Sequence, residues 1–215
     1  MLRCSLLLSL IALALPGFAH ALDFQVDFRQ STYQVTAGDA FLDLLAEHQS
    51  GALIQDNVIE SLENVSTSVH GGGVTSNYSI LISTEFTVDV AGEYTFQVGT
   101  DWGRGGVAAL IDTGSGTVLD ERVLTGNLWW ANNWNNPSVF TTTHDFEVGD
   151  QYTLAWVGFE DCCGGASTLR FSIDGSAYQN LTAGNVGPFL LTPEPGVATL
   201  LLLGLGGLAA TRSRD

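Results

Sequence analysis

The chain has 215 residues, with no lysine, 7 arginines and 23 acidic residues, and its formal net charge is −16 at pH 7. Such a surface repels nucleic acid and anionic lipid, because contacts with phosphate need cationic side chains. With 45% hydrophobic and 10% aromatic residues the chain is too apolar to be disordered. The composition therefore indicates a folded, solvated protein that has no nucleic-acid partner.

The N-terminus, residues 1–21, has the three-part pattern of a secretory signal peptide. Arg3 precedes an apolar run at 6–15, a Pro-Gly break follows, and Ala19 and Ala21 are the small residues that a signal peptidase reads. We expect this segment to form a signal helix that is cleaved after Ala21. The protein is therefore predicted to be exported.

Residues 22–191 are long enough for one extracellular domain with a proper core. Alternating apolar residues predict a first strand at 24–28. The apolar spacing at 38–51 predicts a helix, and a second short helix is expected at 53–64. A glycine-rich connector follows at 69–77.

From residue 78 onward the pattern is β throughout. The expected strands are 78–83, 85–90, 93–98, 106–112, 117–124, 138–148, 152–159, 167–174 and 177–181. Short strands with Gly, Asp and Asn turns at this spacing favour an antiparallel sandwich over a parallel α/β sheet. The predicted fold is mostly β, an antiparallel β-sandwich of jelly-roll type with one or two short N-terminal helices.

Part of this β region resembles a known family. A G-x-Y-x-F strand at 92–96, an acidic turn at 100–103, an apolar strand ending in Asp112 and a G-D-x-Y strand at 149–152 are similar to PA14-type sandwiches. That family is used in adhesins, toxins and glycosidase accessory modules. The resemblance implies a PA14-like fold and a carbohydrate ligand.

The same resemblance implies calcium. PA14-type lectins hold calcium with paired acidic residues in the turn after the Y-x-F strand. Asp101 matches the first acidic position, and Trp102 stands at the second. Glu160 and Asp161 supply further carboxylates if the two loops meet, and oxygen ligands suit calcium. Alternatively, Asp101 accepts hydrogen bonds from local backbone amides; no cofactor is then required.

The segment at 126–138 interleaves tryptophans with asparagines. Indole faces stack on the C–H faces of sugar rings, and amides serve sugar hydroxyls. The predicted ligand-binding residues are Trp129, Trp130, Trp134, Asn132, Asn133, Asp101 and Trp102. The alternative is that the loop folds its tryptophans back onto the core.

Cys162 and Cys163 are adjacent and have no other cysteine partner in the exported domain. An oxidising compartment favours a disulfide between them. Neighbouring Cα atoms lie about 3.8 Å apart, below the usual disulfide range of roughly 4.4–6.8 Å, so this ring is strained. Intermolecular bridges and free thiols stay open as alternatives.

The C-terminus, residues 192–215, has three parts in a fixed order. Pro193, Glu194 and Pro195 precede an apolar run at 196–210, and two arginines follow. As a helix this run rises only about 23 Å, a marginal membrane segment. The order resembles the PEP-CTERM sorting signal recognised by exosortases of Gram-negative bacteria that make exopolysaccharide. With Cys-Cys-Gly in the domain, the whole chain is similar to the CCXG family of PEP-CTERM proteins.

No motif of a nucleophilic, metal-dependent or phosphate-binding enzyme is present in the sequence. We therefore expect a protein that binds rather than catalyses, with extracellular polysaccharide as ligand and an exosortase as processing partner. The resemblance implies transient insertion of the C-terminal helix in the inner membrane, then residence in the cell envelope or matrix. The alternatives are a structural assembly protein and, with less support, a polysaccharide hydrolase.

Overall fold

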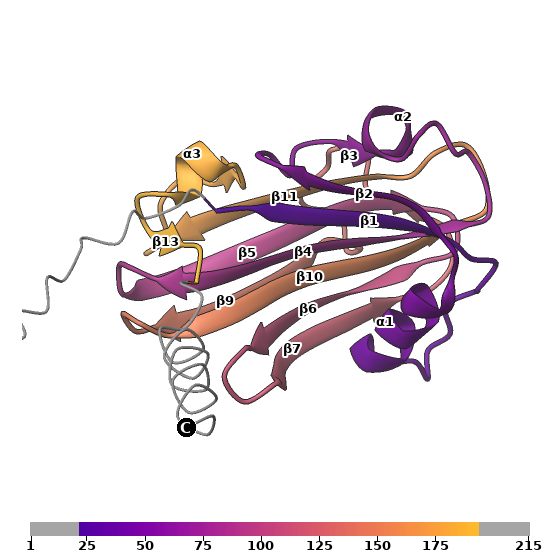
Figure 1. Cartoon of the computed structure of the whole chain (residues 1–215). Helices are drawn as coiled ribbons and strands as arrows, with labels where there is room; N and C mark the ends of the chain where they lie inside the picture. Colours follow the sequence, from indigo (N-terminus) through magenta and orange to yellow (C-terminus); the bar gives the residue numbers. More distant parts are fainter. Residues whose placement is uncertain (1–21, 194–215) are drawn as a thin grey trace, which may run out of the picture.

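The computed structural model describes residues 22–193, which form two antiparallel sheets packed face to face (Figure 1). This confirms the predicted antiparallel sandwich. Ala19 and Ala21 of the predicted signal peptide lie outside the described residues. So do Glu194, Pro195 and the C-terminal apolar run; of the predicted sorting motif only Pro193 is described.

The first sheet has seven strands. In spatial order they are β2 (Leu53–Ile59), β1 (Phe24–Gln30), β4 (Tyr78–Val88), β10 (Gln151–Glu160), β6 (Gly106–Asp112) and β7 (Thr117–Leu124), with β13 (Leu190–Leu191) also paired to β4. Figure 1 shows this sheet in front. Its central strands, β4 and β10, come from distant parts of the chain and pair along ten residues.

The second sheet has six strands. They are β12 (Gln179–Asn180), β11 (Ala166–Ile173), β5 (Gly92–Trp102) and β8 (Leu128–Trp129), with β3 (Val65–Ser66) paired to β11 and β9 (Phe140–Phe146) paired to β5. Between residues 22 and 193 the structure also has three helices: α1 (Phe41–Ser50), α2 (Thr67–His70) and α3 (Ala183–Val186).

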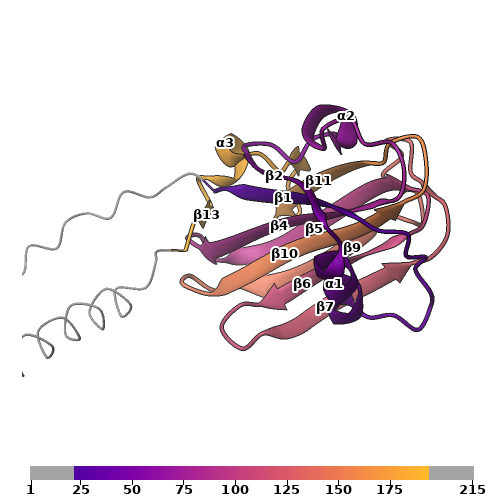
Figure 2. The ribbon, with the colours of Figure 1, turned by 45° about the vertical axis from the view of Figure 1, so that its right-hand side comes forward.

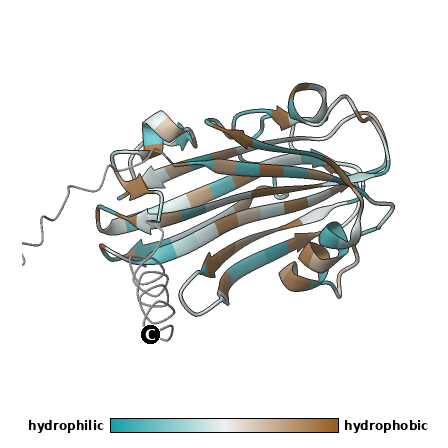
Figure 3. Cartoon of the chain, in the orientation of Figure 1, coloured by the Kyte–Doolittle hydropathy of each residue, from teal (hydrophilic) through white to brown (hydrophobic). Residues whose placement is uncertain are grey.

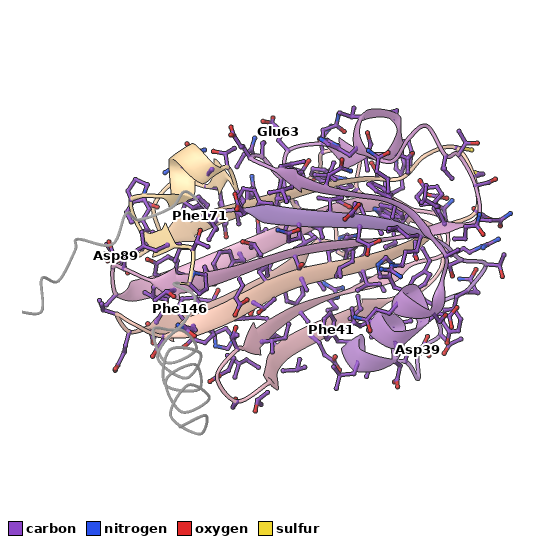
Figure 4. The ribbon with its side chains drawn as sticks, in the orientation of Figure 1. Asp39, Phe41, Glu63, Asp89, Phe146 and Phe171 are labelled. Carbon is purple, nitrogen blue, oxygen red and sulfur yellow. The ribbon has the colours of Figure 1, made fainter. Side chains whose placement is uncertain are left out.

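The main core lies between the sheets and is rich in aromatic residues. Apolar and polar residues alternate along the strands, as the hydropathy colours of Figure 3 show, so each sheet turns its apolar face inward. Figure 4 labels two of the core side chains, Phe146 and Phe171, which come from β9 and β11 of the second sheet. Both are at most 3% exposed.

Helix α1 covers the outer face of the first sheet (Figures 1 and 2). Its residues Phe41 and Leu44 pack with Val107, Ala109 and Val157 in a second apolar cluster. Strands β6 and β10 are therefore buried on both faces, which explains their nearly continuous apolar runs.

Three sequence-based assignments differ from the structure. The helix expected at 53–64 is strand β2, because residues 53–59 pair antiparallel with β1. The turn expected at 100–103 starts later in the chain: β5 continues to Trp102, so Asp101 and Trp102 lie on a strand and only Gly103 lies in the turn. The strands expected at 78–83 and 85–90 are one continuous strand, β4.

The described chain begins and ends at the same end of the sandwich, where β1 starts and β13 lies (Figure 1). The ends of β5 and β10 lie at the opposite end, since Glu160 pairs with Tyr78 at the start of β4 while β13 pairs with Val88 at its end. An eleven-residue strand at about 3.3 Å per residue separates the two ends by about 30 Å. Among the described residues, no helix is long and apolar enough to cross a membrane.

Candidate functional site

A hollow of about 460 Å³ opens at the end of the sandwich that lies away from the described termini. It forms where the end of β5, strand β8 and the segment after β10 converge. Its lining residues are Asp101, Trp102, Gly103, Asn127, Leu128, Trp129, Glu160, Asp161, Cys162, Cys163 and Gly164. The fold therefore brings together the acidic positions, the cysteine pair and one end of the tryptophan segment.

Glu160 is a buried carboxylate that lines this hollow and holds two backbone segments together. It is 4% exposed, and its carboxylate accepts the backbone N–H of Gly103 at 3.1 Å, of Asp161 at 2.9 Å and of Cys162 at 3.1 Å. Burial raises the pKa of Glu160, and the three amide hydrogen bonds oppose that shift. Glu160 thus ties the segment after β10 to the segment after β5.

Asp101 anchors the tryptophan segment. Its Oδ1 accepts the backbone N–H of Trp130 at 2.6 Å and of Ala131 at 3.3 Å. Ala131 and Asn132 both have positive φ, 48° and 59°, so this turn is tight. Asp101 therefore satisfies backbone amides, the alternative considered for it, although the amides belong to a distant segment and not to its own turn.

Two of the three predicted metal ligands lie close together. One ligand atom each from Glu160, Asp161 and Cys162 lies within 4.8 Å of the others, whereas Asp101 lines the same hollow but does not belong to this cluster. No described residue donates a hydrogen bond to Asp161, so both of its oxygens are free to bind a cation such as calcium. The Glu160 oxygens are already engaged by amides.

The predicted disulfide is not formed in this structure, where Cys162 and Cys163 are free, exposed thiols. Cys163 has a φ of 70° and Gly164 a φ of 85°, so two consecutive residues in the left-handed region form a tight turn, here called the cysteine knuckle, at the rim of the hollow. The hydrogen bond to Cys163 raises the pKa of Cys162 to about 11. At neutral pH the thiol therefore predominates, and not the thiolate that binds metals.

Two of the predicted ligand-binding tryptophans are buried. Trp102 is 1% exposed, and its Nε1 donates to Ser167 Oγ at 2.9 Å; Trp130 is 3% exposed. Trp130 packs flat over Gly99, where any Cβ would meet its ring closer than 3 Å. Because both rings are buried, neither can offer its face to a sugar.

Trp129 keeps its predicted surface position. It is 71% exposed at the rim of the hollow, the most exposed large apolar side chain among the described residues. Asn127 lines the hollow with it, whereas Asn132 does not. Both asparagines are exposed, and their amide groups form no hydrogen bond within the described part of the chain. Asn133 accepts the N–H of Asn135 at 3.1 Å and so shapes the loop.

Trp134 does not reach the hollow. Its ring lies edge-on to Trp130, at 4.5 Å between centroids, and its face lies 3.9 Å from the guanidinium carbon of Arg170 in β11. Trp134 therefore belongs to the outer face of the second sheet. No motif around Arg170 marks it as a functional residue; the one signal in the sequence is that the predicted domain has only four arginines.

Comparisons with known proteins agree with this fold. No family model and no curated protein matches the chain. Among solved structures, the PA14 sugar-binding domain from an RTX adhesin matches with a TM-score of 0.50 at 11% identity, over 81% of this chain and all of that domain.

Two yeast adhesin domains match as well. The epithelial adhesin 9 A domain from Candida glabrata, in complex with Galβ1-3GlcNAc, has a TM-score of 0.54 at 9% identity, over 84% of this chain and 94% of that one. The epithelial adhesin 6 A domain from the same organism, in complex with the same disaccharide, has a TM-score of 0.50 at 12% identity, over 85% of this chain and 91% of that one. The described residues therefore have the fold of a PA14-type β-sandwich.

Proposed function

We propose that this chain is an exported, non-catalytic carbohydrate-binding protein whose ligand site is the hollow beside Trp129. The observation that carries the proposal is the exposed indole of Trp129 at the rim of a hollow that also offers the Asn127 amide and the Asp161 carboxylate. An apolar ring face with a few placed polar groups is the arrangement that sugar rings require.

The structural neighbours support the same class of ligand. One is described as a sugar-binding domain, and two were solved with a galactose-containing disaccharide. Their identity to this chain is 9–12%, so the likeness concerns the fold, and the ligand is inferred from the geometry of the hollow.

The test is equilibrium binding of the purified protein to Galβ1-3GlcNAc, to lactose and to the exopolysaccharide of the producing organism. Trp129→Ala is expected to weaken binding at least about tenfold, since burial of one large apolar side chain contributes about 1.5–3 kcal/mol. Leu42→Ala is the matched control, because Leu42 is another exposed apolar side chain, 63% exposed, on helix α1. Equal affinity of both variants would refute the site.

Calcium binding by Asp101, Glu160 and Asp161 is part of this proposal. Its support is that all three carboxylates line one hollow and that Asp161 has both oxygens free. Calcium is then expected to raise the melting temperature and the sugar affinity, and EGTA to reverse both effects. Asp161→Asn would remove the response, with Asp56→Asn, on the edge strand β2 of the first sheet, as the control.

A second candidate function is assembly through the cysteine pair. Its support is the exposure of Cys162 and Cys163 on the cysteine knuckle at the molecular end, where they can pair with each other or with another chain. Oligomers that dissolve in reductant would favour assembly. Mass loss of two hydrogens in an oxidised monomer would instead establish the vicinal disulfide, and sugar binding with and without reductant would show whether the ring contributes.

Sorting by an exosortase rests on the sequence pattern at 192–215 and on no structural observation. It predicts that the protein reaches the cell envelope or matrix after the C-terminal segment is removed. Substitution of Pro193, Glu194 and Pro195 by alanine should leave the unprocessed chain in the membrane fraction. Normal processing of that variant would overturn the sorting proposal.

A further inference from the structure

Arg170, on the outer face of the second sheet, is held between two aromatic rings. Its guanidinium carbon lies 3.9 Å from the ring centroid of Trp134 and 4.3 Å from that of Tyr178. Both rings thus contact the same guanidinium, and no ring contact joins Trp134 to Tyr178 among the described residues. Each contact of this kind contributes roughly 0.5–2 kcal/mol. The rings therefore fix the plane of the guanidinium.

A row of polar side chains positions the same group from the sheet. Asn180, Arg170, Gln97 and Thr141 lie opposite one another across β12, β11, β5 and β9. Gln97 links two of them, because its Oε1 accepts from Arg170 Nε at 2.8 Å while its Nε2 donates to Thr141 Oγ1 at 3.1 Å. Only Nη1 and Nη2 of Arg170 are left without a hydrogen bond to any described residue.

The other described arginines use their terminal nitrogens. Arg29 forms an ion pair with Asp27 at 2.9 Å. Arg104 donates to Asn77 and to a backbone carbonyl, and Arg122 donates to two backbone carbonyls. Arg170 alone among the four keeps both terminal nitrogens free.

No carboxylate neutralises Arg170 within the described chain, whose ion pairs involve only Asp27. Partial burial lowers the pKa of Arg170, as expected for a guanidinium without an ion-pair partner. The side chain is half-buried, and its free nitrogens are not among the buried unpaired atoms, so they reach solvent. A free, fixed cation is unusual in a chain of net charge −16.

We propose that Arg170, Trp134, Tyr178 and Gln97 form a second binding site, which takes the carboxylate of an acidic sugar. The two nitrogens at the open edge of a guanidinium match the two oxygens of a carboxylate in one plane. The exposed part of Tyr178, 40% of the residue, can contact the C–H face of the same sugar. The site therefore fits a hexuronate.

The net charge of the chain further limits which acidic polysaccharides this site can bind. A net charge of −16 repels a polymer in which every sugar is acidic. The site therefore favours an isolated uronate within an otherwise neutral polysaccharide. This site lies on the sheet face and does not share Trp129 with the hollow, so the two can be tested separately.

The experiment is a ¹⁵N-HSQC titration of the purified protein with methyl β-glucuronide and, in parallel, with methyl β-glucoside. The indole N–H signal of Trp134, assigned by its loss in Trp134→Phe, reports directly on the ring beside Arg170. We expect saturable shifts with the glucuronide and affinity at least about tenfold lower for the glucoside, because hydrogen bonds to a charged group contribute about 1.5–3 kcal/mol.

Three variants decide the assignment. Arg170→Gln should weaken glucuronide binding at least about tenfold, and Arg170→Lys, which keeps the charge but loses the planar fork, should weaken it as well. Arg104→Gln is the charge-matched control and should bind like the wild type.

Three outcomes would overturn the proposal of a second site. Equal loss in Arg104→Gln would show that only net charge matters, and equal shifts with sodium sulfate would show a general anion site. Loss of glucuronide binding in Trp129→Ala would place the sugar in the hollow. Failure of galactoside binding with intact glucuronide binding would refute the proposed function alone.

Discussion

Two tryptophans near the same hollow have opposite roles at the scale of single residues. Trp102 lies inside, where Gly158 and Gly165 make room for its ring and Ser167 accepts its N–H. Trp129 lies outside at the rim. Neighbouring residues on a strand point to opposite faces of the sheet. Trp102 pairs with Leu128 and faces inward, whereas Trp129 pairs with Asp101 and faces outward.

This difference predicts opposite effects of truncation. Trp102→Ala should lower the free energy of unfolding by about 3–5 kcal/mol, since it leaves a cavity in the core. Trp129→Ala should change it by less than about 0.5 kcal/mol, as surface substitutions do. Urea denaturation followed by circular dichroism measures both. A large loss for Trp129→Ala would mean that its ring packs on the domain.

His48 carries a second prediction at this scale. It is fully buried on α1, its Nδ1 lies 2.8 Å from Ser79 Oγ, and Asp27 lies 3.7 Å from Nε2, with Arg29 beside that carboxylate. Desolvation lowers the pKa of His48 to about 4, against the attraction of Asp27. The neutral imidazole is therefore the form that the folded state holds.

The unfolded state then takes up a proton near pH 6.5, and the folded state only near pH 4. The free energy of unfolding should fall as the pH decreases from 6.5 to 4, by up to about 3 kcal/mol from this group. Urea titrations at several pH values, on wild type and His48→Gln, measure it. The variant should have the shallower profile, and parallel profiles would show that His48 does not titrate as inferred.

At the scale of elements, helix α1 depends on a residue far away in the chain. Its N-cap is Ala40, which has no side-chain oxygen, and the N–H of Phe41 donates instead to Glu121 of β7 at 2.8 Å. A carboxylate at this position also complements the positive end of the helix. The sequence could not show this partner, because it is 80 residues away.

Glu121→Ala should therefore lower the free energy of unfolding by about 1 kcal/mol, the usual contribution of an N-terminal cap. Asp120→Ala is the matched control, since Asp120 is the adjacent acidic residue and accepts no hydrogen bond from a described residue. Thermal denaturation of both variants, monitored by circular dichroism, gives the comparison. Equal losses would show that only the charge of β7 matters.

Strand β5 shows at the same scale how much of the site the sequence could predict. Its inward residues Tyr94, Phe96 and Val98 were recognised from their alternation and are buried. Its last residues were expected to turn, because Asp and Gly favour turns. Pairing of Asp101 with Ala166 on β11 and with Trp129 on β8 extends the strand, and only tertiary contact supplies those partners.

At the scale of the whole molecule, repulsion between the many carboxylates destabilises the folded state. Carboxylates even face each other within a sheet, as Asp27 and Asp56 do across β1 and β2. Like charges in such positions destabilise the pair, and a net charge of −16 adds general repulsion in the compact state.

Added salt should therefore stabilise this protein. The melting temperature is expected to rise between about 20 mM and 0.5 M NaCl, because the screening length falls below about 10 Å over that range. Asp56→Asn should raise the free energy of unfolding at low salt by about 0.2–1 kcal/mol, and with it the melting temperature. The variant should also respond less to added salt. Differential scanning calorimetry tests this, and a flat salt profile would contradict it.

The sequence by itself determined the class of fold, since alternation of apolar residues states which side chains face a core and turn residues state where strands end. It also determined the charge, and hence which ligands are repelled. Only the tertiary structure decided which tryptophan is exposed, which amides occupy Asp101 and Glu160, and which rings flank Arg170. Those arrangements join strands that lie far apart in the chain, and no local pattern encodes which strands become neighbours.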